Sequence, residues 1–169
     1  REVPQRFWEV PKAIVKQAPK QLPFVGVMGL HRSGSSCLAG VVHRLGVHMG
    51  NRFIGCEPDG GYEARDLARL LEQAMPFPGT SINMDMRNLT SRLHRWISAR
   101  ITEATAAGTV AGGKYPHLCA FMQQLVDATN GGLLVVHIDR PLEQSIASLI
   151  RRDGKRRDHK KLAAVQEFL

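Results

Sequence analysis

Residues 26–46 read GVMGLHRSGSSCLAGVVHRLG, and the pattern of this stretch is the clearest indication of the fold. An apolar run ends at Gly29, and apolar side chains then recur at helical spacing from Cys37 to Leu45. The pattern predicts a buried strand, a tight loop and a helix that stops at Gly46. Residues 29–36, GLHRSGSS, have the spacing of the phosphate-binding loop G-x-x-x-x-G-K-[ST], but Ser35 stands where that loop has its lysine.

Several groups in this loop could hold an anion without the lysine. Gly29 and Gly34 allow a tight turn and a close approach of the backbone to a ligand. The first N–H groups of the following helix, together with its dipole, attract negative charge. Arg32 is a replacement cation that can pair with an oxyanion in a fork geometry. Further donors are the hydroxyl groups of Ser33, Ser35 and Ser36. A glycine-rich turn that binds nothing is the alternative for the loop taken alone.

The rest of the chain alternates between strand and helix patterns. Strands are predicted within residues 22–30, 109–115 and 131–139, and helices over 35–45, 88–108, 117–128 and 142–152. Residues 56–75 are expected to begin as a turn and to continue as a helix. Such alternation predicts an α/β fold, a three-layer sandwich whose central parallel sheet has helices on both faces. We expect residues 1–22 to form an N-terminal arm and residues 23–169 to form one domain. A ligand site in such a sheet lies beyond the carboxyl ends of the strands.

Composition limits the class of protein and its partners. The 169 residues carry a formal charge of +8 with a pI near 9.9, which favours anionic partners. Much of the excess lies in residues 151–161, RRDGKRRDHKK, which form either a solvated helix end or a ligand-facing segment. No apolar run is long enough to span a membrane. The three cysteines form no recognisable disulfide framework, so we expect reduced thiols and a cytoplasmic location.

A second candidate anion site lies in residues 135–152, VVHIDRPLEQSIASLIRR. Arg140 follows the predicted strand, and Ser148 lies further along the predicted helix. At about 1.5 Å per residue the two positions are roughly 12 Å apart. A long arginine side chain and a hydroxyl close that gap around an intervening group such as a phosphate. For an isolated pair, an arginine bound to a carboxylate and an exposed serine are the simpler interpretation.

Together these features resemble the sulfotransferases that use 3′-phosphoadenosine 5′-phosphosulfate (PAPS), especially their bacterial branch, whose loop often reads GxxRSGTS. Residues 29–50 look like the family's 5′-phosphosulfate loop and first helix, and residues 135–154 look like its 3′-phosphate segment. Residues 60–72, GGYEARDLARLLE, are similar to its acidic GYFED-type segment, and residues 112–119, GGKYPHLC, to its G-x-K-D-P-R segment. The resemblance covers residues 24–154.

The resemblance implies a P-loop-like fold related to the nucleotide kinases, and transfer of a sulfuryl group to a hydroxyl or amine without an obligatory metal. It assigns Arg140 and Ser148 to the 3′-phosphate of the donor. It assigns the 5′-phosphosulfate to the 29–36 loop, with the binding residues Gly29, His31, Arg32, Ser33, Gly34, Ser35 and Ser36. A 3′-phosphate site would also explain why the loop dispenses with its lysine.

The catalytic roles follow in the same way. Arg32 would neutralise the charge that moves onto the bridging oxygen, and Lys114 would assist the leaving group. Glu63 would accept the proton of the acceptor, with His117 and His31 as the other candidates. A surface lysine and a solvated carboxylate at a helix start are equally compatible with Lys114 and Glu63.

The chain also departs from the family pattern. Residues 114–117, KYPH, replace K-D-P-R, and the segment around Tyr62 and Glu63 is one residue short. The sequence ends soon after the Ser148 helix, whereas family members usually continue, so we expect a C-terminally truncated or minimal form.

Two other functions stay open on the sequence. The first is a P-loop kinase or NTPase that uses Arg32 in place of lysine, with Asp139 as its metal ligand. The second is a non-catalytic nucleotide-binding module. Nucleic-acid binding ranks last because no stacking pattern or binding motif accompanies the charge. The sequence does not identify the acceptor, which is expected to be a small molecule or a glycan. It does not indicate the oligomeric state either. Acceptor specificity is expected in the loops at residues 56–61 and 77–88.

Overall fold

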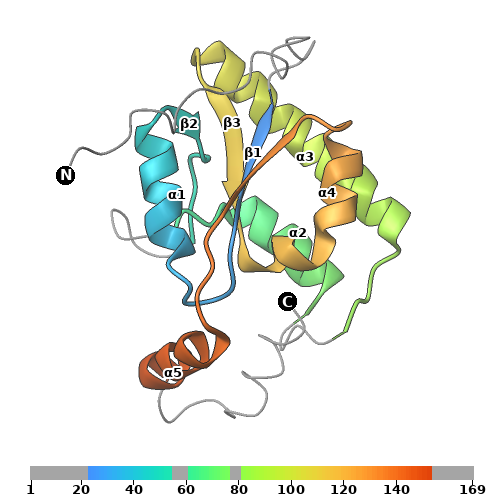
Figure 1. The fold of residues 1–169 in the computed structure, drawn as a ribbon. Helices are drawn as coiled ribbons and strands as arrows, with labels where there is room; N and C mark the ends of the chain where they lie inside the picture. Colours follow the sequence, from blue (N-terminus) through green and yellow to red (C-terminus); the bar gives the residue numbers. More distant parts are fainter. Residues whose placement is uncertain (1–22, 55–60, 77–80, 154–169) are drawn as a thin grey trace, which may run out of the picture.

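The computed structural model describes residues 23–54, 61–76 and 81–153 (Figure 1). The expected N-terminal arm, residues 1–22, lies outside the described residues, as do Cys56 and most of the basic run at 151–161. The elements in chain order are β1 (Phe24–Met28), α1 (Ser35–Arg44), β2 (Val47–His48), α2 (Arg65–Ala74), α3 (Met86–Ala106), β3 (Val110–Lys114), the 3-10 helix η2 (Pro116–Phe121), α4 (Met122–Ala128), β4 (Leu133–His137) and α5 (Leu142–Asp153).

The four described strands form one sheet in the order β2-β3-β1-β4, and every pair in it is parallel. Val25 of β1 lies opposite Gly112 of β3 on one side and Leu134 of β4 on the other. The predicted α/β class and parallel sheet are therefore confirmed. Parallel strands end at a common edge, so the segments that follow β1, β3 and β4 meet there.

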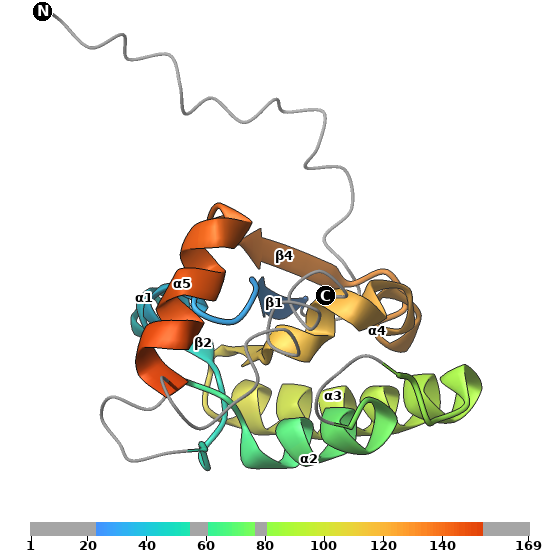
Figure 2. The same cartoon turned by 90° about the horizontal axis from the view of Figure 1, so that it is seen from below.

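Strand β1 divides the core between the two faces of the sheet. Phe24 and Met28 pack into a large cluster with apolar side chains of α2, α3, η2 and α4. Val25 and Val27 point the opposite way and pack against Ala39 and Val42 of α1. Figure 2 shows α2 and α3 together on one side of the strands. Helices thus cover both faces, which is consistent with the expected three layers.

The described helices that carry the core follow simple sequence rules. In α2 the buried residues recur at helical spacing, and they are Leu67, Ala68, Leu70, Leu71 and Ala74. Helix α3 starts at Asp85, whose side chain accepts a hydrogen bond from the Asn88 backbone N–H at 3.0 Å, as a capping residue does. Helix α1 ends before Gly46, which has a φ of 98° that glycine adopts without strain.

Two features differ from the expected element map, and a third concerns the position of β4 in the sheet. The short edge strand β2 was not predicted, because two residues give no periodic signal. The helix expected from residue 117 begins as a 3-10 turn and becomes α-helical at Met122. Strand β4, the most apolar of the strands in sequence, is an edge strand, and Leu134 is 54% exposed. No helix in the described ranges is long and apolar enough to cross a membrane.

Candidate functional site

The loop between β1 and α1 is tightly built around Gly29. A Cβ at this position would lie 2.6 Å from the Ser33 Oγ and 2.8 Å from the Ile138 Cγ2, so only glycine fits. The Ser33 hydroxyl donates to the Leu30 carbonyl at 2.8 Å and is thereby used to close the turn. Gly34 has a φ of 100° and Arg32 a φ of 65°, both in the left-handed region. The expected donor role of Ser33 would require this internal bond to break.

The start of α1 is arranged to attract an anion. Its capping position is Gly34, no side chain of the described residues caps its N–H groups, and its first turn contains no acidic residue. The first N–H groups of a helix have no partner within the helix. The positive end of the helix dipole is therefore not neutralised at Ser35 and Ser36.

Arg32, Arg140 and Ser148 meet on one side of the loop. The Arg32 Nε donates to the Ser148 Oγ at 3.1 Å, and the Arg140 Nη1 donates to the Arg32 carbonyl at 2.8 Å. Figures 1 and 2 show why: α5, which carries Ser148, lies beside the loop that joins β1 to α1. Three predicted ligand residues from two distant segments of the chain are thus in contact.

Lys114, Glu63 and Ser36 meet on the other side of the helix start. Lys114 ends β3, and only 2% of it is exposed. Its Nζ forms an ion pair with the Glu63 Oε1 at 2.5 Å and donates to the Ser36 Oγ at 3.2 Å. The alternative of a solvated surface lysine is therefore wrong. The carboxylate offsets a positive charge that would otherwise be costly to bury.

His117, one of the candidate catalytic bases, also lies beside the loop. Its ring is buried and stands edge-on to the ring of His31, with 5.8 Å between centroids. Among the described residues its Nδ1 has no hydrogen-bond partner. Burial lowers the pKa of His117 below its ordinary value, although Glu72 and Glu63 oppose the shift. Burial therefore favours the neutral form of the imidazole.

The residues around His117 were not singled out by their sequence pattern. Tyr115 donates its hydroxyl to the Glu72 Oε1 at 2.8 Å, and its ring lies 5.0 Å from that of His117. Burial, reinforced by Glu72, raises the pKa of Tyr115 far above its usual range. Burial also raises the pKa of the Cys119 thiol. None of these residue types indicates a site by itself. Tyr115 and Cys119 lie near His117 because all three belong to the turn that follows β3.

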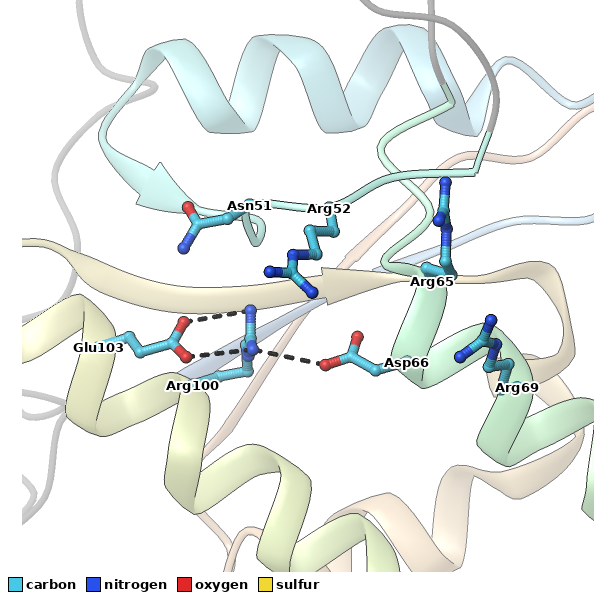
Figure 3. A pocket seen from close by; sticks show the side chains of 7 residues that line it. All are labelled: Asn51, Arg52, Arg65, Asp66, Arg69, Arg100 and Glu103. Atoms are coloured by element: carbon cyan, nitrogen blue, oxygen red, sulfur yellow. Dashed lines mark hydrogen bonds and ion pairs between the residues drawn. The ribbon is translucent and has the colours of Figure 1, made fainter.

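A separate pocket of about 340 Å³ lies on the β2 side of the sheet (Figure 3). None of its lining residues belongs to the 29–36 loop. They come from the segment after β2, from α2 and from α3, and they are Asn51, Arg52, Arg65, Asp66, Arg69, Arg100 and Glu103. The sequence pattern did not single out these arginines, and the fold brings them together from three segments.

Comparisons with models of protein families, with curated proteins and with solved structures found no match to this chain. Within the described ranges, no group of three or more His, Cys, Asp and Glu side chains could hold a metal ion. The geometry of the site therefore carries the functional argument.

Proposed function

We propose that this chain binds PAPS in the 29–36 loop and transfers its sulfuryl group to a hydroxyl or amine acceptor. The observation that carries the proposal is the contact between Arg32, Arg140 and Ser148 beside the uncapped start of α1. Two anion-binding segments resemble those of the PAPS-dependent sulfotransferases, and they are adjacent in space. The loop's position between β1 and α1 of a parallel sheet also supports a P-loop-like, nucleotide-kinase-like fold.

The donor's two anionic ends would lie on the two sides of the Arg32 contact. The 5′-phosphosulfate would lie at the helix start, where the N–H groups of Ser35 and Ser36 and the Arg32 guanidinium supply positive charge. The 3′-phosphate would lie between Arg140 and Ser148. Its oxygens would accept the hydrogen bonds that Arg140 and Arg32 now make to each other and to Ser148.

In the transfer step the acceptor oxygen or nitrogen forms a bond to sulfur, and the bond from sulfur to the bridging oxygen breaks. Negative charge then grows on the phosphate that leaves, and Arg32 and Lys114 would stabilise it. The acceptor's proton needs a base. Glu63 is already ion-paired with Lys114, whereas the neutral His117 has no partner at Nδ1 within the described residues. The proposal therefore favours His117 as the base and Glu63 as the group that positions Lys114.

The kinase alternative needs a carboxylate that holds Mg²⁺ near the loop. Its candidate, Asp139, is exposed on the segment after the edge strand β4. Calorimetric titration with adenosine 3′,5′-bisphosphate and with ADP, each with and without Mg²⁺, separates the two functions. A PAPS site prefers the bisphosphate by about tenfold or more, since a charge-assisted contact contributes about 1.5–3 kcal/mol.

The other outcomes would overturn the proposal. Equal or tighter binding of ADP, strengthened by Mg²⁺, would identify a kinase or NTPase site. Absence of binding by both nucleotides would mean that the loop is a structural turn. Tight bisphosphate binding without turnover on any tested acceptor would identify a non-catalytic module and would leave only the donor half of the proposal standing.

A further inference from the structure

Several arginine side chains lie close together around the pocket in Figure 3. Four guanidinium groups and two carboxylates line it, which leaves an excess of two positive charges. Within the described residues Arg52, Arg65 and Arg69 make no ion pair or hydrogen bond through their side chains. Like charges in one concavity repel, so their proximity is unfavourable until an anion enters.

Arg100 forms the fixed floor of this pocket. Its guanidinium is held by Glu103 at 3.1 Å and by Asp66 at 3.4 Å, and it lies 5.9 Å from the centre of the Trp96 ring. The side chain is 14% exposed. Its Nε is buried and has no hydrogen-bond partner among the described residues.

The opposite wall is held in place by the backbone. The Arg65 N–H donates to the Arg52 carbonyl at 2.9 Å, and Phe53 forms an isolated bridge with Ala64. Figure 3 shows the Arg52 side chain reaching from this wall toward Arg100 and Asp66. The pocket is thus preformed by three separate segments, and its volume lies within the roughly 300–1,000 Å³ of small-molecule sites.

We propose that this pocket is a second anion site, which binds a small molecule through a doubly charged phosphate group. Arginine forks match the oxygens of a phosphate. Asn51 adds an amide donor, and the two carboxylates can accept hydrogen bonds from hydroxyl groups on the rest of such a ligand. The site does not depend on the donor proposal, because none of its residues belongs to the 29–36 loop or to α5.

The test uses the full chain and inorganic phosphate as the probe, at constant ionic strength balanced with sodium chloride. Two-dimensional ¹H–¹⁵N spectra should show saturable shifts at the amides of residues 51–53, 64–69 and 100–103. The double variant Arg52→Gln/Arg69→Gln should weaken this binding by about tenfold or more. The matched control Arg87→Gln/Arg95→Gln removes the same charge from exposed positions of α3 outside the pocket and should leave binding unchanged.

Two results would overturn the inference. One is shifts at these amides that grow linearly with phosphate and never saturate. The other is an equal loss of binding in the pocket double variant and in the α3 control, which would mean that net charge alone attracts the ion. Shifts at amides of the 29–36 loop report on the donor site and are analysed separately. A failure of the donor proposal is therefore distinguishable from a failure of this one.

Discussion

Lys114 is the residue on which the interior of the candidate site depends. It ends a buried strand with an ammonium group almost wholly removed from water, and the Glu63 carboxylate and the Ser36 hydroxyl are its partners. Removal of one member of a buried ion pair leaves the other charge uncompensated, whereas removal of both is often tolerated. The pair is therefore sensitive to single substitutions.

We expect Glu63→Ala to lower the free energy of unfolding by about 2–3 kcal/mol, since Glu63 is partly exposed and the loss is smaller than for a fully buried pair. The double variant Glu63→Ala/Lys114→Met should recover part of that loss because no unpaired charge remains. Urea unfolding of the wild type and the single and double variants measures both values. A double variant less stable than Glu63→Ala would show that Lys114 stabilises the fold without its carboxylate.

His117 makes stability depend on pH. Burial lowers its pKa in the folded state, so the unfolded chain binds more protons once the pH falls toward the ordinary histidine value of about 6.5. The stabilising effect of the neutral imidazole is thus present above that pH and is lost as the pH falls below it. Each unit of depression corresponds to about 1.4 kcal/mol.

His117→Gln should therefore flatten the decline in unfolding free energy between about pH 7 and pH 5. The control His137→Gln removes an exposed histidine of β4 and shows whether the loss of any histidine is enough to flatten the decline. Urea unfolding across that pH range tests the difference. Identical slopes in the His117→Gln variant and the wild type would contradict the lowered pKa.

Among the elements, strand β3 packs closely against its neighbours because two of its residues, Gly112 and Gly113, lack side chains. A Cβ at Gly112 would lie 2.5 Å from the Val47 Cγ1 and 3.0 Å from the backbone oxygen of Val25. A Cβ at Gly113 would meet the Trp96 ring at 2.8 Å and Phe24 at 3.0 Å. The glycines let the neighbouring strands and α3 approach the strand that delivers Lys114.

Gly112→Ala should cost about 1–3 kcal/mol of unfolding free energy, the usual range for overpacking. Gly113→Ala should cost less, because its clashes are with side chains that can move, whereas Gly112→Ala also meets a backbone oxygen. Thermal and urea unfolding of both variants test this order. Two neutral substitutions would mean that β3 has more room than its packing indicates.

Strong periodic signals in the sequence predicted most elements, and weak ones were missed. The apolar stripes of α2 and α3 and the apolar run of β1, which ends at Gly29, reflect burial, which periodicity reads directly. Strand β2 is too short for such a signal. The exposure of β4 could not be predicted, because an edge strand and a central strand of a parallel sheet can have equally apolar sequences.

At the scale of the whole molecule, the topology explains how much of the site could be predicted. Arg32 and Arg140 follow strands and Lys114 ends one, and parallel strands end at one edge, so their convergence was expected from sequence order. The arginine pocket was not expected. Its charges come from helix faces and from a turn whose relative placement depends on tertiary packing.

In the proposed function, Arg140 and Ser148 bind the 3′-phosphate of the donor beside the loop. The most direct test is calorimetric titration of the wild type and of Arg140→Ala with adenosine 3′,5′-bisphosphate and with adenosine 5′-monophosphate. Arg95→Ala, which removes an exposed arginine of α3, is the matched control.

We expect the wild type and the control to prefer the bisphosphate by about tenfold or more and Arg140→Ala to lose this preference. The ratio of the two affinities is the deciding quantity, because Arg140 also contacts the Arg32 carbonyl and its loss weakens the binding of both nucleotides if that contact shapes the loop. An unchanged ratio in Arg140→Ala, or no preference in the wild type, would show that Arg140 and Ser148 do not bind a 3′-phosphate.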